Sequence, residues 1–417
     1  MLNRTRLSSL DAFGLRDQRN RIYPALEASD GSTLSLAFTQ MSNLTSSGFT
    51  LSRATGGGKV GTATYIDNTG YLVSASASMP RFEYDPTTLA PRGLLIEGES
   101  TNLLNLSETF ATSGGTNNNW ADTNLTRNST NNTSPRNDAT ALRVTASAAN
   151  GTLISTTAIG TTAQRTLSVW LRRVTGTGAI QYTLNNGTNW TTQAITSSWV
   201  RYTFAATTAA QQVGFRIVAN DDAIEIWGAQ LEAGAAATSY IPTTTATVTR
   251  AADKLSMTDI STIQWNQTAG TFLWDMDVQS ETNTSSFPAF AGMYRAGPVR
   301  VIRFQLNNSS GTNPRIGGGT WTATPSALVA DTFYTRSVAT PFKAAVAFAN
   351  TGQSMTYCIN GTVQSTVTGT GTLATATLFL MHQDPSAADT EYFPIHLRQL
   401  KYWPTNLSSS DIRSITT

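Results

Sequence analysis

The sequence predicts an all-β protein, with two antiparallel β-sandwich domains of the jelly-roll type after an extended N-terminal segment. Only 13% of the 417 residues are charged, and Ser, Thr, Asn and Gly take the place of the missing charges. Apolar and polar residues alternate in many short runs, which is the pattern of half-buried antiparallel strands. Turn sequences such as Asn185-Asn186-Gly187 separate these runs.

Length and composition limit the number of domains and the kinds of partner that the protein can have. A chain of 417 residues suggests two or three domains of roughly 100–200 residues each. No window approaches the roughly 18 consecutive apolar residues of a membrane-spanning helix, and residues 1–23 lack the apolar run of a signal peptide. The net charge is +2 without a basic stripe, so we expect neither nucleic-acid binding nor membrane insertion. The one cysteine, Cys358, cannot form an internal disulfide and is expected to be a buried structural thiol.

Residues 1–100 are predicted to form an extended N-terminal segment that packs on another surface. Two short strand-like runs lie at residues 63–67 and 70–73. Prolines in the runs 80–86 and 91–97 then favour extended backbone there.

Residues 101–245 are predicted to form the first sandwich. Its expected strands are 141–145, 165–172, 180–184, 199–204, 212–218 and 223–227. The segment 112–138 is rich in Asn and Thr and is expected to be a long loop.

Residues 246–254 are the expected linker, and residues 255–417 are predicted to form the second sandwich. Its expected strands are 270–278, 300–306, 332–337, 343–349, 354–359, 362–367, 378–381 and 394–403. Asn360-Gly361 is the strongest hairpin signal in the chain. Ser408 or Ser409 could cap a final helical turn.

Three segments resemble bacteriophage structural proteins. Residues 80–104, PRFEYDPTTLAPRGLLIEGESTNLL, are similar to a segment near the start of tail, fibre and head-appendage proteins. Residues 226–253, IWGAQLEAGAAATSYIPTTTATVTRAAD, resemble the end of carbohydrate-binding-module-like jelly rolls in the same proteins. Residues 396–415, HLRQLKYWPTNLSSSDIRSI, are similar to the closing strand and helical turn of concanavalin A-like (laminin-G-type) lectin domains.

The resemblance implies a virion protein that acts by adhesion or in particle architecture. It assigns residues 1–100 to virion attachment through other virion subunits, 101–245 to the jelly roll and 255–417 to the lectin sandwich. Analogy with phage fibres implies a homotrimer. The location implied is the tail or capsid surface after synthesis in the host cytoplasm.

Few residues suggest catalysis. The two histidines, His382 and His396, are expected to be structural, and no HExxH or GxSxG motif or cysteine pair is present. We therefore expect no enzyme and no catalytic residue. Carboxylates that could face a sugar are Glu225 with Glu232 and Asp275 with Asp277. No cofactor is expected, although Asp275 and Asp277, two apart in a strand, could instead hold calcium or simply face solvent.

Sugar binding is the function that the aromatic residues favour, because flat rings stack on pyranoses while amides bind hydroxyl groups. The candidates are loop tryptophans beside Asn or Gly, namely Trp120, Trp190 with Asn189, and Trp321. Core or oligomer contacts are the alternative role for these tryptophans. The strand tryptophans are expected to be core: Trp170, Trp199, Trp227, Trp274 and Trp403.

The sequence thus predicts a fibre or spike that binds host surface glycan for adsorption. A capsid or tail decoration protein without a receptor role is the alternative. A glycan-degrading spike is a weaker alternative, because no long β-helix repeat is visible.

Overall fold

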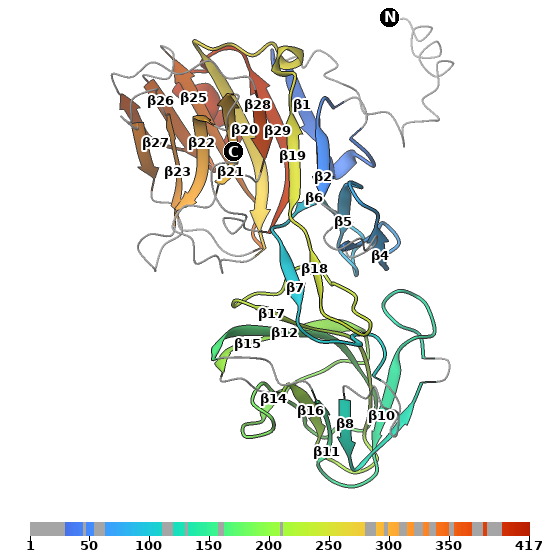
Figure 1. Cartoon of the computed structure of the whole chain (residues 1–417). Coiled ribbons are helices and arrows are strands. Elements are labelled where there is room, and N and C mark those ends of the chain that lie inside the picture. Colours follow the sequence, from blue (N-terminus) through green and yellow to red (C-terminus); the bar gives the residue numbers. More distant parts are fainter. Residues whose placement is uncertain are drawn as a thin grey trace, which may run out of the picture.

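In the computed structural model 50% of the chain is β-strand, arranged in antiparallel sheets, which confirms the predicted all-β class (Figure 1). It describes residues 30–44, 47–53, 63–110, 120–129, 132–156, 162–208, 212–279, 289–295, 299–307, 315–320, 328–332, 339–349, 354–368, 378–381 and 394–417. Two lobes are visible, and strands β7 and β18 run between them. Among the described residues, no helix is long and apolar enough to cross a membrane.

The first sandwich has two five-stranded sheets, and its expected strands are confirmed. One sheet has the order β15 (Val200–Thr208), β12 (Ala163–Thr175), β17 (Ala223–Ala233), β10 (Leu142–Ala146) and β9 (Leu125–Asn128). The other has the order β14 (Thr191–Gln193), β13 (Ile180–Thr183), β16 (Gly214–Ile217), β11 (Gly151–Ser155) and β8 (Trp120–Thr123). The alternation of apolar and polar residues explains why β10 forms a sheet with one buried face. Leu142, Val144 and Ala146 are buried in the core. Arg143 and Thr145, between them, point to the other face.

The second sandwich has an eight-stranded and a seven-stranded sheet. The larger has the order β27 (Thr362–Thr368), β26 (Ser354–Ile359), β25 (Phe342–Ala349), β20 (Gly270–Val278), β29 (Ile395–Trp403), β6 (Pro91–Ile96) and β5 (Arg81–Tyr84), and β1 (Leu34–Ala37) also pairs with β29. The smaller has the order β2 (Thr50–Arg53), β19 (Asp253–Met257), β28 (Leu378–Met381), β21 (Ala289–Arg295), β22 (Val299–Asn307), β23 (Arg315–Thr320) and β24 (Leu328–Thr332).

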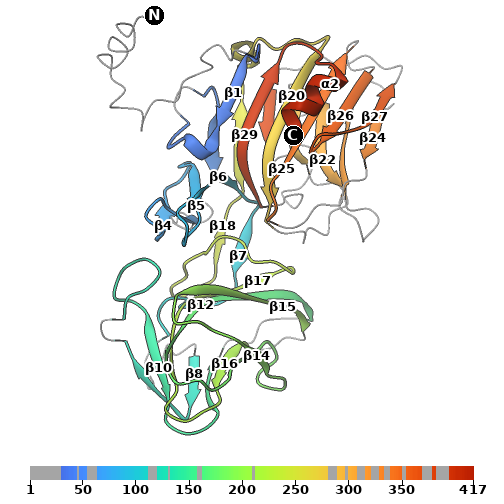
Figure 2. The same cartoon turned by 180° about the vertical axis from the view of Figure 1, so that it is seen from behind.

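The expected strands of this sandwich are also found, except that most of 332–337 lies outside the described residues. Asn360 and Gly361 both have positive φ angles, 44° and 73°, as the predicted β26–β27 hairpin requires. Helix α2 (Ser409–Thr416) starts at a Ser408 capping box and covers the outer face of β25 and β26 (Figure 2). Cys358 lies under this helix, where its Sγ is 3.1 Å from Thr416 Oγ1, so it is the structural thiol that was expected.

The expectation of a separate N-terminal segment is corrected by this topology. Strands β1, β2, β5 and β6 belong to the two sheets of the second sandwich. Leu94 and Ile96 of β6 are fully buried and share a core cluster with Phe272 and Trp274 of β20. The pairing of β6 with β29 joins residues about 300 positions apart, which local sequence patterns cannot reveal. Residues 1–29 lie outside the described residues.

The expected linker is also ordered as strands. β18 (Val248–Arg250) pairs with β7 (Ser100–Asn102), and β19 begins at Asp253. The chain therefore passes twice between the lobes, once on the way in and once on the way out. The remaining elements are the hairpin of β3 (Ala63–Ile66) and β4 (Leu72–Ala75) and two 3-10 turns, η3 (Phe38–Gln40) and η5 (Ile260–Ile263).

A buried ionic network lies where the crossing strands enter the second sandwich. Arg81 donates to Glu97 at 2.7 Å and to Asp253 at 2.5 Å, and Arg53 pairs with Asp253 at 2.6 Å. Arg250 Nη1 lies 3.4 Å from Glu97 Oε2. These five residues, Arg53, Arg81, Glu97, Arg250 and Asp253, are called the junction cluster below. Four of the five belong to two of the segments that resemble phage proteins, so these segments meet in space.

Opposite charges keep the junction cluster ionised. Burial alone would raise the pKa of Glu97, but Arg250 and Arg81 outweigh burial, and the pKa stays well below its usual range. The pKa of Asp253 is lowered in the same way, because Arg81 and Arg53 outweigh its burial. The cluster therefore contains charges that water cannot solvate and that stabilise one another.

Candidate functional site

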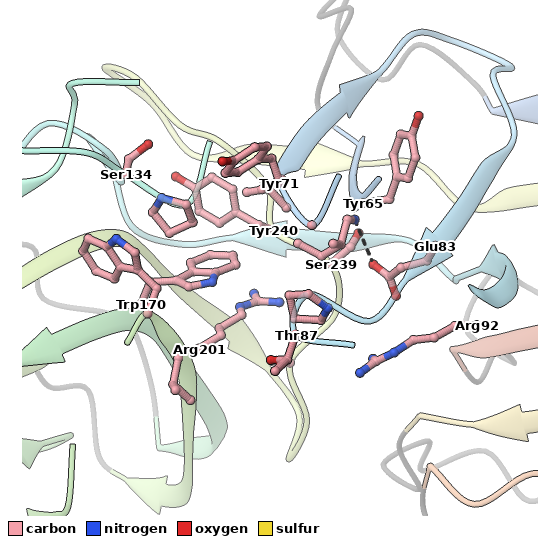
Figure 3. A pocket seen from close by; sticks show the side chains of 18 of the residues that line it. Tyr65, Tyr71, Glu83, Thr87, Arg92, Ser134, Trp170, Arg201, Ser239 and Tyr240 are labelled. Carbon is pink, nitrogen blue, oxygen red and sulfur yellow. Dashed lines mark hydrogen bonds between the residues drawn. The ribbon is translucent and has the colours of Figure 1, made fainter. Parts of the chain in front are cut away.

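A pocket with a volume of about 760 Å³ lies between the β3–β4 hairpin and the first sandwich (Figure 3). One wall comes from the hairpin, from the turn between β5 and β6 and from the start of β6, and it includes Tyr65, Tyr71 and Arg92. The opposite wall comes from β12 and β15 and includes Trp170 and Arg201. The pocket is thus assembled from segments that lie far apart in the sequence, including residues 133–137 and 237–240.

A tight turn presents the aromatic side chains of the hairpin. The carboxylate of Asp67 accepts hydrogen bonds from the backbone N–H groups of Thr69 at 2.9 Å and Tyr71 at 3.3 Å. Gly70 in this turn has a φ of +82°, a conformation that side chains disfavour. The hairpin is joined to the first sandwich because Leu72 N–H donates to the Pro135 carbonyl at 3.1 Å.

Two of the exposed large hydrophobic side chains line the pocket. Among the described residues, the exposed large hydrophobic side chains are Tyr71 (42%), Met79 (40%), Leu89 (45%) and Val200 (38%). Tyr71 and Val200 line the pocket, and Leu89 is next to Gly70, which also lines it. Leu89 has a φ of +57°, so a bulky residue is held in a strained conformation with its side chain in solvent. Strain and apolar exposure at one place are typical of a binding surface.

The sandwich wall provides further rings. Trp170 is buried and lies edge-on to Tyr240, with ring centroids 5.4 Å apart. Trp199 is half-buried, and its indole N–H donates to the Thr133 carbonyl at 3.0 Å. The Arg172 guanidinium lies 4.9 Å from the Trp199 ring centroid. These contacts fix the rings before any ligand arrives.

Charged groups of both walls face the same space. Arg92 pairs with Asp85 at 2.8 Å, and Arg172 pairs with the buried Glu225. Backbone N–H of Thr88, together with Arg92, holds the pKa of Asp85 well below its usual range. Arg201 donates to the Thr238 carbonyl at 2.8 Å and to Ser168 Oγ at 2.9 Å. Burial lowers the pKa of Arg201, against the opposing effect of Glu232.

Glu83 also lines the pocket and is bonded to a buried histidine. His396 Nε2 is 2.7 Å from Glu83 Oε2, and its Nδ1 is 3.0 Å from Asp277 Oδ1. A neutral imidazole has one N–H only, so donation to both carboxylates requires the imidazolium form. Burial on its own would lower the pKa of His396, but the bonds to Asp277 and Glu83 raise it to about 9.

Trp120 and Trp190, two of the tryptophans predicted to bind sugar, do not line this pocket. Trp120 was expected in a loop but begins β8, and it is 1% exposed and packs against Phe110 and Phe215. That correction follows from the residues 120–128, which form β8 and β9 instead of a loop. The Trp120 ring is therefore not available for stacking on a sugar.

Trp190 and Asn189 do lie in a loop, before β14. Trp190 is half-buried, and the Arg216 guanidinium lies 4.5 Å from its ring centroid. The exposed Asn189 donates its backbone N–H to Asn185 Oδ1 at 2.9 Å. A role for this loop in sugar binding stays a prediction. Trp321 and His382 lie outside the described residues.

The strand tryptophans are core residues with one exception. Trp170, Trp227, Trp274 and Trp403 are buried as expected. Trp199 is not, because it precedes β15 and lies at the bend where the strand begins. The pocket residues that sequence reasoning missed include Tyr65 and Tyr71, although both were within predicted strand-like runs. Their place in one pocket with the half-buried Trp199 depends on contacts between distant segments.

The predicted carboxylate pairs are already bonded within the protein. Glu225 is buried against Arg143 and Arg172, while Glu232 accepts hydrogen bonds from Ser100 and Thr238, each at 2.6 Å. These two carboxylates thus have structural partners and do not line the pocket.

Asp277 and Asp275 also have protein partners. Asp277 is bonded to His396, and Asp275 lies 3.4 Å from Arg398. β20 has a register irregularity against β29 between Asp275 and Met276. In the part of the chain that the structure describes, no group of three or more His, Cys, Asp or Glu side chains is placed to hold a metal ion. A calcium ion at Asp275 and Asp277 stays a prediction.

The pocket combines aromatic faces with a small number of oriented polar groups. Ring faces and apolar rims bind the C–H surface of a sugar, while guanidinium and hydroxyl groups bind its oxygen atoms. Its volume suits a ligand of one to a few sugar rings.

Comparison with known proteins gives structural likeness only. No protein-family model and no curated protein matches the chain. The binding domain of botulinum neurotoxin serotype D matches 39% of this chain with 12% identity and a TM-score of 0.31. The Ruminococcus gnavus IT-sialidase CBM40, solved with alpha2,3 sialyllactose, matches 36% of this chain and 84% of its own length, with 12% identity and a TM-score of 0.30. This chain spans 40% of the length of the serotype D domain.

Proposed function

We propose that this chain is a glycan-binding protein whose sugar site is the pocket between the β3–β4 hairpin and the first sandwich. The observation that carries the proposal is the meeting of Tyr65, Tyr71 and Trp199 with oriented polar groups in one pocket of about 760 Å³. The exposed apolar rim of Tyr71, Leu89 and Val200 supports it, because such a rim is costly without a ligand.

We also propose the biological setting that the sequence segments imply. The protein is carried on the surface of a bacteriophage particle as a fibre or spike, and it binds host glycan for adsorption without cleaving it. Support comes from the three segments that resemble phage proteins. Trimer formation would add avidity to weak individual sites. A reconstruction of purified particles tests this setting, and absence of the chain from the particle surface would refute it.

The pocket predicts specific binding mutants. Trp199→Ala and Tyr71→Ala should each weaken binding of a host-surface oligosaccharide about tenfold, because each removes a stacking face worth about 1.4 kcal/mol. The measurement is a glycan array with the full chain, followed by isothermal titration calorimetry with the best-bound oligosaccharide. Circular dichroism of each variant checks that the sheets are retained.

Trp190→Ala is the matched control, since Trp190 is also half-buried and carries an arginine on its ring but lies outside the pocket. We expect it to bind like the wild type. If Trp190→Ala lost binding while Trp199→Ala and Tyr71→Ala kept it, the sugar site would be the loop before β14. No binding to any glycan or to host cells would favour the decoration role, and release of reducing sugar would favour a glycan-degrading spike.

A further inference from the structure

Arg201 differs from the other arginines that line the pocket. Arg92 and Arg172 each have a carboxylate partner, Asp85 and Glu225 respectively. Arg201 has no carboxylate within 4 Å among the described residues. Its two hydrogen bonds are to a neutral carbonyl and a neutral hydroxyl. A partly buried cation without a counterion is costly, and a ligand carboxylate would remove that cost.

Nearby carboxylates of the protein are already bonded elsewhere. Glu97 accepts bonds from Arg81 at 2.7 Å and from Ser239 Oγ at 2.6 Å. Glu83 is bonded to His396 at 2.7 Å. Glu232 accepts from Thr238 and Ser100 and has Gln230 Nε2 at 2.7 Å. These groups moderate the charge of Arg201 from a distance but do not occupy its donors.

The geometry prepares Arg201 for a planar acidic partner. Its guanidinium lies 4.7 Å from the Trp170 ring centroid, and the two hydrogen bonds hold it in place. A guanidinium has five N–H donors, so N–H donors of Nη1 and Nη2 remain after these two bonds. Nε is buried and has no hydrogen-bond partner in the described structure. Figure 3 shows the Arg201 side chain directed into the pocket from the sandwich wall, opposite Thr87 and Arg92.

We infer that the glycan bound in this pocket contains an acidic sugar whose carboxylate pairs with Arg201. The inference rests on the proposed function and adds the ligand class. Arginine–carboxylate pairs are often bidentate and stronger than neutral hydrogen bonds, so the carboxylate should dominate selectivity. Uronic acids and sialic acids both supply this group.

The test is calorimetric titration of the full chain with matched oligosaccharides. The probes are a glucuronate-containing tetrasaccharide, a sialic acid-terminated trisaccharide and the carboxyl-reduced form of each. We expect one acidic probe to bind about tenfold or more tightly than its reduced form. Arg201→Gln should bring the affinity for that acidic probe down to that of the reduced form. Arg201→Lys should keep part of the preference because it retains charge without the planar fork.

Arg216→Gln controls for a change in net charge, since Arg216 lies outside the pocket, and it should keep the preference. If acidic and reduced probes bound the wild type equally, this inference would be overturned while the proposed sugar site would stand. If no probe and no other glycan bound, both would fail. A preference lost in Arg216→Gln but kept in Arg201→Gln would also overturn it. The ratio of the affinities of the acidic and carboxyl-reduced probes is measured on the wild type alone. A folding defect in Arg201→Gln would therefore not prevent the test.

Discussion

Asp253→Asn should destabilise the protein by about 3–5 kcal/mol, the loss expected when one partner of a buried ionic network is removed. Asp253 accepts hydrogen bonds from Arg53, Arg81 and the backbone N–H of Glu97. The side chains of Asp253, Arg53 and Arg81 are nearly inaccessible to solvent. Without its charge, three arginines of the junction cluster would have only Glu97 as a counterion. The measurement is the urea midpoint followed by tryptophan fluorescence, because urea leaves the ionic strength unchanged.

Asp85→Asn is the matched control. Asp85 also pairs with an arginine, at 2.8 Å, but both side chains are partly exposed in the turn between β5 and β6. Surface pairs of this kind contribute about 1 kcal/mol or less. We therefore expect a small shift for Asp85→Asn. Equal shifts in the two variants would show that the junction cluster contributes no more than a surface pair.

The sequence was sufficient to predict the strands because their causes are local. Residues 270–278 form β20 over the predicted range, and Asn360-Gly361 forms the predicted hairpin turn. In both cases the apolar pattern or the turn chemistry lies within a few residues. The capping box at Ser408 is local for the same reason.

The partners of those strands could not be predicted, since pairing depends on contacts between distant residues. Arg81 bonds Asp253 across 172 positions, and no spacing rule connects them. For this reason the N-terminal strands were assigned to a separate segment although they complete the second sandwich. The same limit applies to the pocket, where the Thr64 hydroxyl donates to the Tyr240 carbonyl across 176 positions and helps to dock the hairpin.

Tryptophan exposure was predicted poorly for a related reason. Trp120 and Trp199 were assigned from their neighbours in the sequence, one to a loop and one to a core. Asn-rich neighbours do not determine whether a ring is exposed, because a strand can begin immediately after them, as β8 does. Exposure is decided by which element packs above the ring.

The stability of the protein should fall as pH rises from about 6.5 to about 9, and His396 should be the cause. The pKa of His396 is about 6.5 in an unfolded chain and is raised to about 9 in the fold. Protonation therefore favours the folded state. The stabilisation is fully present below pH 6.5 and is lost as pH rises through 9. This difference in pKa between the folded and unfolded states corresponds to roughly 3 kcal/mol of folding stability.

The comparison with His396→Gln isolates this contribution, because other groups titrate alike in both proteins. Glutamine can donate to Glu83 or Asp277 but carries no charge that changes with pH. The variant should be less stable than the wild type at pH 6, and the difference in unfolding free energy should shrink by pH 9.5. A difference that stayed constant from pH 6 to 9.5 would contradict an ionised histidine between the two carboxylates.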